Sequence, residues 1–440
     1  MMQTISDSPF RLSPTSRANF SPSVTLHINE RVKQMWAEGR DVYHLGFGES
    51  RFPVHPTLQE ALRANAHRKS YLSVQGLLEL REQIAGFYSR QLGREVSAEQ
   101  IIVGPGSKVL IYALQMALDG ELLLPTPSWV SYAPQAHLLA KPMRYIPASS
   151  ADNYEFTLEA LDQTVQQKPD VPKTLLINSP NNPTGRMFEP SFLEKLADYC
   201  RQQRIMVLSD ELYGLIPHAH STHVSLAHYY PEGTVVLGGL SKQLSLGGWR
   251  LGVAVLPSDE GGMQLMRSLC KIASETWSTS SGPIQYAAIS AYREDPDITA
   301  YMHECAQIHA IRTQHLWSWL VEFGIPCAQP DGGFYMLPNF ERWREPLAAR
   351  GVYTSSDLTT YLLEKYQIVT LPGIAFGVPP QDLSVRLASS YLDMENEQKA
   401  DAILAAYRDN PDAQHLMEQH HPATGEAIRR FGQFMESLTT

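Results

Sequence analysis

The sequence predicts an α/β protein: a large three-layer domain with a mostly parallel sheet, plus a smaller α+β domain built from both chain ends. Two observations predict this fold class. Up to about residue 300, short apolar segments alternate with longer segments of helical periodicity, which is typical of βαβ units whose sheet is covered on both faces. Beyond that point short strands with helices around them indicate a smaller α+β domain.

The expected elements follow one another along the chain. A polar arm rich in serine and proline comes first, and helical periodicity then runs from about residue 24 to residue 38. Strands are expected at residues 101–103, 121–124, 174–178, 205–209, 234–237 and 251–256. Helices are expected between several of these strands, at residues 108–118, 191–203 and 283–293.

A long helical pattern then runs from residue 295 to about residue 323 and ends at Gly324, as helices commonly do. Short strands follow at residues 333–337, 368–371 and 384–387, and the last segment is expected to form helices broken at Pro411 and Pro422. These patterns predict four parts: an N-terminal arm with part of the small domain (1–50), the large domain (51–300), the small C-terminal domain (301–395) and a helical extension (396–440).

The composition is that of a globular protein. Hydrophobic residues make up 43% and charged residues 19% of the chain, which excludes disorder as its main state. The net charge of −10 argues against nucleic-acid and membrane partners. No apolar stretch reaches the roughly 18 residues that span a bilayer, and the polar first twenty residues do not resemble a secretory signal. Four cysteines without CxxC spacing predict neither disulfides nor a zinc site, so we expect a cytoplasmic protein.

Two motifs follow expected strands with backbone and amide groups that suit a ligand, because ligands of open α/β sheets lie beyond the carboxyl ends of the strands. The first opens a helix with Gly106, Ser107 and Lys108, whose amides can cradle a phosphate. The second, SPNNPTG, holds Asn182 in a constrained turn. A plain structural turn is the alternative for each motif taken alone.

Two further motifs carry charged groups. Asp210 closes a buried strand and Tyr213 follows three residues later; a buried aspartate is costly unless it meets a cation or several donors. Lys242 closes the next strand, where partial burial favours a nucleophilic amine, and Arg250 supplies a fork suited to phosphate. The alternative for this last motif is a surface lysine in a glycine-rich loop. Together the four motifs meet the requirements for binding pyridoxal 5'-phosphate.

In these motifs the chain resembles the class I/II aminotransferase family, the fold-type I pyridoxal-phosphate enzymes related to aspartate aminotransferase. The resemblance runs from about Tyr43 to Leu387 and rests on SPNNPTG, DELY, a lysine with an arginine eight residues later, and a late VRL. It implies that Lys242 carries the cofactor as a Schiff base, that Asp210 pairs with the ring nitrogen, and that Asn182 and Tyr213 hydrogen-bond the ring oxygen. Lys242, Asp210 and Tyr213 are the expected catalytic residues.

The resemblance also implies the remaining contacts. The phosphate would be bound by Arg250, by the amides of residues 106–108, and by Tyr71 reaching into the partner subunit of a homodimer with shared active sites. Trp129 would stack on the ring. The substrate would meet Phe47, Gly48, Trp129 and Asn182, with Arg386 holding its α-carboxylate.

The chain departs from the family pattern at three positions. Gly239 stands where many relatives have a serine, which leaves Ser241 as the nearby hydroxyl for the phosphate. In the segment that resembles GxGEPDF, Ser50 replaces the proline and Arg51 the acid.

The resemblance implies a pyridoxal-phosphate-dependent aminotransferase that moves an amino group from an L-amino acid to a 2-oxo acid in ping-pong order. A lyase or cyclase acting at the β or γ carbon, for example on S-adenosylmethionine, is the alternative with the same motifs. A ligand-sensing regulator on the same fold is disfavoured, because the segment before the resemblance is short and the chain is acidic. For the donor we favour a neutral or aromatic amino acid, with Arg51 as the residue that would serve a dicarboxylic one.

Several residues stay open. His218, His220, His223 and His228 crowd one segment, but no acid or cysteine accompanies them and we expect a surface connection without a metal. Lys108 is either a ligand for a distal carboxylate or a solvated helix residue, and we favour the second. Tyr335 is a candidate for the substrate pocket, although a core position is favoured.

Overall fold

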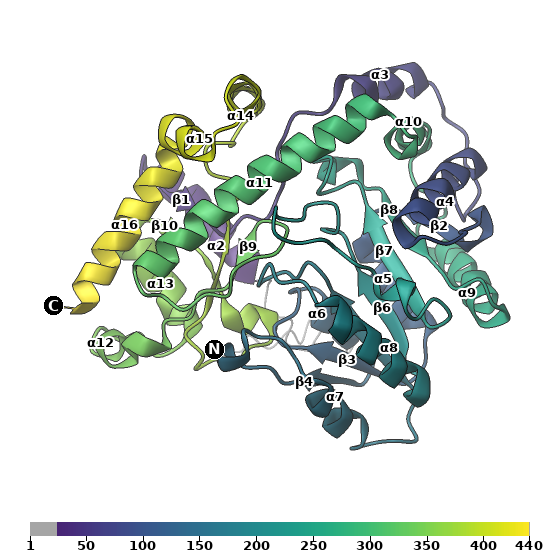
Figure 1. The fold of residues 1–440 in the computed structure, drawn as a ribbon, viewed down its shortest axis with the longest axis horizontal. Helices are drawn as coiled ribbons and strands as arrows, with labels where there is room; N and C mark the ends of the chain where they lie inside the picture. The colour runs from purple at the N-terminus through teal and green to yellow at the C-terminus, as the bar shows by residue number, and fades with distance from the viewer. Residues whose placement is uncertain (1–23, 440) are drawn as a thin grey trace, which may run out of the picture.

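A computed structural model describes residues 24–439, so the predicted polar arm lies mostly outside the described residues. Its main feature is a sheet of seven strands in the spatial order β2-β8-β7-β6-β5-β3-β4 (Figure 1). Strand β8 runs antiparallel to β2 and β7, and the other neighbours are parallel. The strands are β2 (Ile101–Gly104), β3 (Glu121–Pro125), β4 (Met143–Ile146), β5 (Lys173–Asn178), β6 (Met206–Asp210), β7 (Thr234–Gly239) and β8 (Gly252–Val255).

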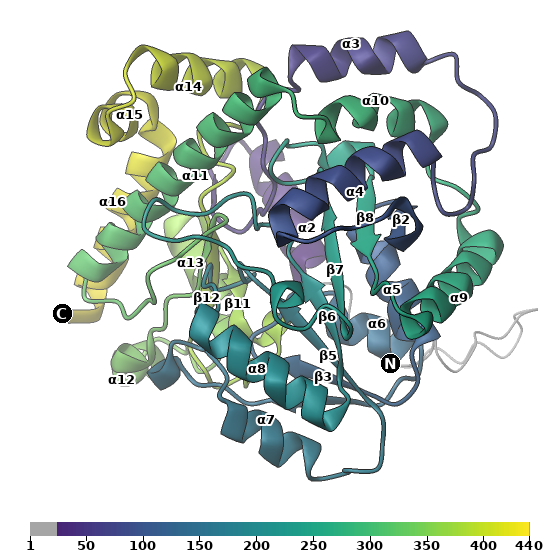
Figure 2. The ribbon, with the colours of Figure 1, turned by 45° about the vertical axis from the view of Figure 1, so that its right-hand side comes forward.

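Helices cover both faces of this sheet, because the strands are apolar at successive positions and successive side chains point to opposite faces. In β7, Val235 and Leu237 pack toward one layer of helices, whereas Val236 packs toward the other. The first layer holds α5 (Ser107–Ala117), α6 (Tyr132–Leu138) and α9 (Glu260–Thr276). The second holds α3 (Pro56–Asn65), α4 (Leu78–Leu92), α7 (Leu158–Val165), α8 (Pro190–Gln203) and α10 (Gly282–Tyr292) (Figure 2). The predicted three-layer arrangement is confirmed.

Helix α11 (Pro296–Glu322) runs from the large sheet to the smaller part of the protein (Figure 1). The side chain of Asp295 accepts hydrogen bonds from the amides of Asp297 and Ile298, and Pro296 at the first position needs no amide partner, so the helix start is well defined. The prediction of a linking helix over residues 295–323 is therefore close to the observed bounds.

The smaller part combines both chain ends, as predicted. Strand β1 (Tyr43–His44) pairs in parallel with β10 (Ile368–Val369). Strands β11 (Leu371–Pro372), β12 (Val385–Ala388) and β9 (Tyr335–Met336) form a second, antiparallel sheet. Its helices are α2 (Val24–Ala37), α12 (Arg344–Ala348) and α13 (Ser355–Tyr366).

The C-terminal extension is helical and belongs to the core. It comprises α14 (Glu397–Asp409), α15 (Ala413–His420) and α16 (Pro422–Thr439). Phe431 and Phe434 of α16 pack in the apolar cluster of the smaller part, and Ile403 of α14 joins the cluster of the large part. The Asp393 carboxylate accepts hydrogen bonds from the first amides of α16. The domain boundaries at residues 50, 300 and 395 stay predictions.

None of the helices between residues 24 and 439 is both long and apolar enough to cross a bilayer. All four cysteines are free.

Candidate active site

An open cavity of about 930 Å³ lies at the carboxyl ends of β5, β6 and β7. The three strands are parallel and in register, so the groups that follow them meet at one edge of the sheet. Most of the predicted site residues line this cavity: Phe47, Gly48, Ser107, Lys108, Trp129, Asn182, Asp210, Tyr213, Lys242 and Arg386. Tyr335, for which a core position was favoured, lines it as well.

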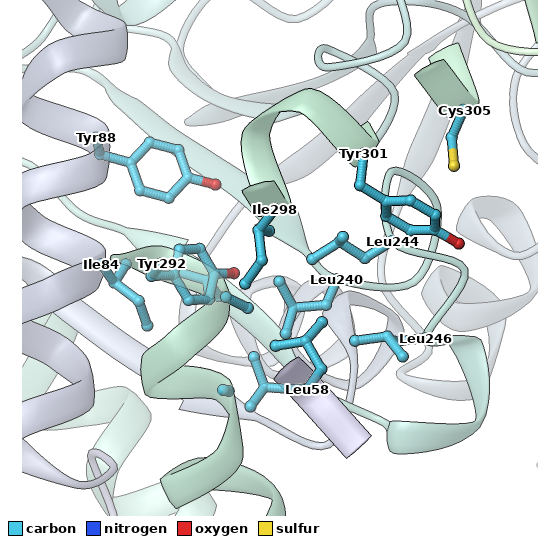
Figure 3. Packing of buried hydrophobic residues seen from close by; sticks show 14 of the residues in the cluster. Leu58, Ile84, Tyr88, Leu240, Leu244, Leu246, Tyr292, Ile298, Tyr301 and Cys305 are labelled. Atoms are coloured by element: carbon cyan, nitrogen blue, oxygen red, sulfur yellow. The ribbon is translucent and has the colours of Figure 1, made fainter. Parts of the chain in front are cut away.

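Lys242 is held in a fixed turn at the end of β7. Leu240, Leu244 and Leu246 on either side of it are buried in the apolar cluster that Figure 3 shows. The Lys242 Nζ donates a hydrogen bond to the carbonyl oxygen of Gly48 at 2.8 Å. The turn is therefore anchored by packing, while its amine reaches into the cavity.

Asp210 is a buried acid at the end of β6. Its carboxylate accepts hydrogen bonds from the Tyr132 hydroxyl at 2.7 Å and from the Leu212 amide at 3.3 Å. Burial raises the pKa of Asp210 to about 6, although these two donors favour the charged form. A cation placed against this carboxylate would therefore offset the cost of burying its charge and stabilise the folded protein. Tyr132 belongs to the sequence motif around Trp129. Its hydrogen bond to Asp210 depends on the orientation of α6, and no local sequence pattern predicts that orientation.

Arg386 places a guanidinium with spare donors in the cavity. It is 4% exposed, and it donates hydrogen bonds to the Asn182 Oδ1 at 3.2 Å and to the Gly46 carbonyl. Its Nε has no hydrogen-bond partner among the described residues. A buried, partly unpaired guanidinium is costly, and a carboxylate from a ligand would satisfy it. The rings of Tyr335 and Phe376 lie against it at 4.7 and 5.3 Å.

Tyr213 and Tyr335 meet on the same side of the cavity. Their hydroxyls lie 3.0 Å apart, and the Tyr335 hydroxyl donates to the Gly48 carbonyl at 3.2 Å. Burial and the neighbouring Tyr335 raise the pKa of Tyr213 well above its ordinary value. Tyr213 is therefore a neutral hydrogen-bond donor and not a phenolate.

The segment that is predicted to cradle a phosphate lies where α5 begins, and its role stays a prediction. Gly106 has φ 93°, a conformation that favours glycine, and a Cβ there would overlap the guanidinium of Arg250. The amides of Ser107 and Lys108 thus begin a helix directly beside that cation. At Gly239, a Cβ would lie 2.7 Å from the Leu251 carbonyl oxygen, so a serine there would require the backbone to shift. Ser241 does not line the cavity, and its role stays a prediction.

Lys108 lies at the open cavity with its side chain exposed, and its Nζ is 4.9 Å from the centre of the Trp129 ring. Partial burial lowers its pKa, with a smaller effect from the charges of Arg250 and Lys242. Both interpretations of Lys108, a solvated helix residue and a ligand for a distal carboxylate, stay predictions. The spacing of the motif placed its backbone, but the direction of its side chain depends on the contact with Trp129.

Arg51 faces away from the cavity. Its guanidinium donates to the carbonyls of Met394 and Glu395 at 2.9 and 3.0 Å and to the Glu49 carboxylate at 2.9 Å. Its donors are thus used within the protein. Tyr71 is 89% exposed and does not line the cavity of its own chain.

The histidine-rich segment differs from the expected surface connection at one residue. His218 is buried, and its ring nitrogens lie 2.9 and 3.1 Å from the carbonyl oxygens of Pro330 and Gly333. The His218 side chain points inward from a segment that otherwise runs at the surface, where His220 and His228 are exposed. Within residues 24–439 no three His, Cys, Asp or Glu side chains are grouped so as to hold a metal ion.

The residues fit pyridoxal phosphate on three observations of this structure. Asp210 is a buried acid with no ion pair among the described residues, the Arg250 guanidinium lies beside Gly106 at the start of α5, and the Lys242 amine lies in the same cavity as Asp210. The unpaired Nε of Arg386 adds a place for a second anion, the carboxylate of a substrate.

A lysine amine, a buried acid and a guanidinium with an unpaired Nε in one cavity are typical of an enzyme that handles amino acids or related carboxylic acids. The model of the family described as aminotransferase class I and II matches residues 40–403. The chain therefore belongs to this family, and the predicted aminotransferase activity, from an amino acid to a 2-oxo acid, is confirmed; the lyase or cyclase alternative is not favoured.

Three known proteins illustrate the similarity. The chain is 34% identical over 372 residues to an aspartate aminotransferase of Geobacillus stearothermophilus, covering 82% of this chain and 91% of the relative. It is 32% identical to an asparagine–oxo-acid transaminase of Streptococcus mutans, covering 81% and 90%. The crystal structure of an aromatic aminotransferase from Pyrococcus horikoshii superposes with a TM-score of 0.73 at 28% identity, covering 86% of this chain and 99% of that one.

Proposed function

We propose that this aminotransferase uses pyridoxal 5'-phosphate bound at Lys242. The observation that carries the proposal is the meeting of Lys242, Asp210 and the Arg250 cradle at one sheet edge. When bound, the cofactor supplies an aldehyde for amines and a ring that accepts electrons from the substrate's α-carbon. Lys242 would hold it covalently, Asp210 would accept a hydrogen bond from the protonated ring nitrogen, and Asn182 and Tyr213 would hold the ring oxygen.

The remaining steps follow from the positions of the side chains. Arg386 would bind the α-carboxylate of the amino acid with its unpaired Nε and fix the orientation of the α-carbon. We expect Lys242 to remove the α-proton, and the hydrogen bond that orients its amine toward the Gly48 carbonyl supports this role. Trp129 and the apolar cavity wall would exclude water.

The experiment that tests this activity adds single amino acids to the purified protein and measures formation of the matching 2-oxo acid. Amino transfer should proceed past one turnover only when a second 2-oxo acid is supplied, since the ping-pong order requires an acceptor. Continued turnover without an acceptor would instead favour elimination or cyclisation.

We further propose a dicarboxylic amino donor, in place of the neutral or aromatic donor that the sequence favoured. Lys108 and Arg386 line the same cavity, and burial disfavours the charged form of Lys108, so a distal carboxylate beside it would recover part of that cost. The name of the aspartate aminotransferase supports this proposal. The asparagine–oxo-acid transaminase and the aromatic aminotransferase support the neutral or aromatic donor class.

Lys108→Ala is expected to raise KM for aspartate and glutamate by about 10- to 100-fold, since a hydrogen bond between charged groups contributes about 1.5–3 kcal/mol. KM for alanine and phenylalanine should stay within about twofold. Steady-state kinetics with the four donors measure both effects. Lys271→Ala removes an exposed lysine on α9 and serves as the matched control. A selective loss for the acidic donors in Arg51→Ala, with none in Lys108→Ala, would show that Arg51 is the ligand after all.

We propose a homodimer with shared active sites. Tyr71 supports this, because an aromatic side chain 89% exposed on one chain is suited to contact another. Its hydroxyl would then reach the phosphate bound by the partner subunit.

Tyr71→Phe should weaken cofactor retention by about tenfold, since it removes one hydrogen bond to an anion. Tyr353→Phe, at another exposed tyrosine, should leave retention unchanged. Equilibrium titration with pyridoxal phosphate measures the effect, and sedimentation measures the assembly. A fully active monomer at micromolar concentration would contradict the proposal.

For the location we propose the cytoplasm. The four free cysteines support this, since oxidising compartments favour disulfides.

A further inference from the structure

Ser50 occupies an unusual place in the segment 46–52, where the resemblance leads one to expect a proline. It is 2% exposed, and its hydroxyl makes two contacts inside the protein. The Ser50 Oγ lies 2.6 Å from the Oγ of Ser245 and 2.9 Å from the Nε2 of His309. Proline has no group that could make either contact, so the exchange adds a buried polar connection to this part of the site.

Ser245 belongs to the turn that carries Lys242. Its amide donates to the Lys242 carbonyl at 3.3 Å, and its φ of 57° is a left-handed conformation that non-glycine residues adopt at a cost. Its hydroxyl also accepts a hydrogen bond from the Phe52 amide at 3.1 Å. Ser50 and Phe52 therefore both bind the Ser245 side chain. Their hydrogen bonds hold Ser245, three positions after Lys242, in its left-handed conformation.

His309 supports the connection from behind. It is 1% exposed in α11, where its ring lies 5.0 Å from that of Phe52 and 4.8 Å from that of Phe334. Burial lowers the pKa of His309 well below its ordinary value, so the ring is neutral. A neutral, packed imidazole is a fixed partner for the Ser50 hydroxyl.

These contacts close a ring of interactions around the amine. Gly48, two residues before Ser50, accepts the hydrogen bond from the Lys242 Nζ at 2.8 Å. The segment 46–52 is thus joined to the lysine turn through the Lys242 amine at Gly48 and through the Ser245 hydroxyl, which contacts both Ser50 and Phe52. We expect the distance between the Gly48 carbonyl oxygen and the Lys242 Nζ to depend on these contacts of the Ser245 hydroxyl.

We propose that Ser50 is a positioning residue for Lys242: its hydroxyl, fixed by His309, ties the segment that carries the Gly48 carbonyl to the turn that carries the lysine. The proposal rests on the role of Lys242 as the base that removes the α-proton. A change at Ser50 should affect the chemical step and not substrate binding. Ser50 does not line the cavity, and it does not contact Arg386, the residue expected to bind the amino acid.

The test compares Ser50→Ala, Ser245→Ala, their double variant, Ser50→Thr and Ser89→Ala. Ser89 is the matched control, a half-buried serine on α4 whose hydroxyl donates to the Ala85 carbonyl and accepts from the Val96 amide, far along the chain from the site. Each enzyme is loaded with cofactor, and kcat and KM are measured. Hydrogen exchange of peptides covering residues 240–250 reports the mobility of the lysine turn without depending on activity.

Ser50→Ala should lower kcat by about tenfold, since small displacements of a catalytic group are costly, with KM for the donor within about twofold. The double variant should fall no further than about twofold below Ser245→Ala, because Ser245→Ala already removes the contact with Ser50. Ser50→Thr keeps the hydroxyl and should restore most of kcat. Hydrogen exchange over residues 240–250 should be about threefold faster or more in Ser50→Ala and unchanged in Ser89→Ala.

An unchanged kcat in Ser50→Ala would overturn the proposal, as would an equal loss in Ser89→Ala or a rise in KM without loss of kcat. Independent, multiplying losses in the two single variants would also overturn it. If the wild-type protein itself shows no amino transfer, the proposed role of Lys242 fails, whereas unchanged hydrogen exchange in Ser50→Ala would reject the connection itself.

Discussion

Lys242→Ala is expected to abolish amino transfer, with kcat reduced by about four orders of magnitude or more, because general base catalysis alone contributes up to about 10⁴-fold. The variant also loses the amine that would hold the cofactor covalently. Its fold should persist, since Leu240, Leu244 and Leu246 anchor the turn through their own burial. The melting temperature, measured beside kcat, separates a loss of chemistry from a loss of structure.

The covalent bond has a direct measurement. Borohydride reduction of the loaded wild-type enzyme, followed by peptide mass mapping, should place the cofactor adduct on Lys242. Lys271→Ala is the control for removing a lysine and should give the same adduct at full activity. An adduct on Lys108, the other lysine that lines the cavity, would reject the assignment.

Most of the site could be predicted from sequence because its groups stand directly after strands. Asn182, Asp210 and Lys242 follow β5, β6 and β7, and the parallel register of these strands brings them together without help from distant residues. The same reasoning gave the three-layer fold, since alternating apolar residues with helices between the strands leave few other arrangements.

Side chains whose direction depends on distant contacts could not be predicted in this way. The Lys108 amine lies over the Trp129 ring, and Arg51 turns away because the carbonyls of Met394 and Glu395 accept its hydrogen bonds. His309 lies more than 250 positions from Ser50 in the sequence, and nothing local to either residue indicates that they meet. Local pattern therefore places the backbone, and packing between remote segments decides which way a long side chain points.

Asp210 gives the second large expectation, since its burial links function to stability. In the cofactor-free protein burial raises the pKa of Asp210 from 3.8 to about 6, so the folded state binds a proton more tightly than the unfolded state. Stability from this group is therefore greatest at low pH, falls as pH rises from about 4 to about 6, and is constant above that. The difference between the pKa of 3.8 in the unfolded chain and about 6 in the folded protein lowers the free energy of unfolding by about 3 kcal/mol at pH 8.

Asp210→Asn should thus stabilise the cofactor-free protein at pH 8 by up to about 3 kcal/mol, and the gain should be about 1 kcal/mol smaller at pH 5. The same change should lower kcat by about two to three orders of magnitude, because the charge that keeps the ring nitrogen protonated is gone. Denaturant unfolding at the two pH values, with Asp170→Asn as an exposed control, measures the first effect, and kinetics measure the second. Loading with cofactor should reverse the order of stability, since a cation against the carboxylate removes the cost of burying it. If Asp210→Asn is instead less stable than the wild type at pH 8 without cofactor, Asp210 contributes to the fold through its bonds to Tyr132 and Leu212 and is not held in readiness for a cation.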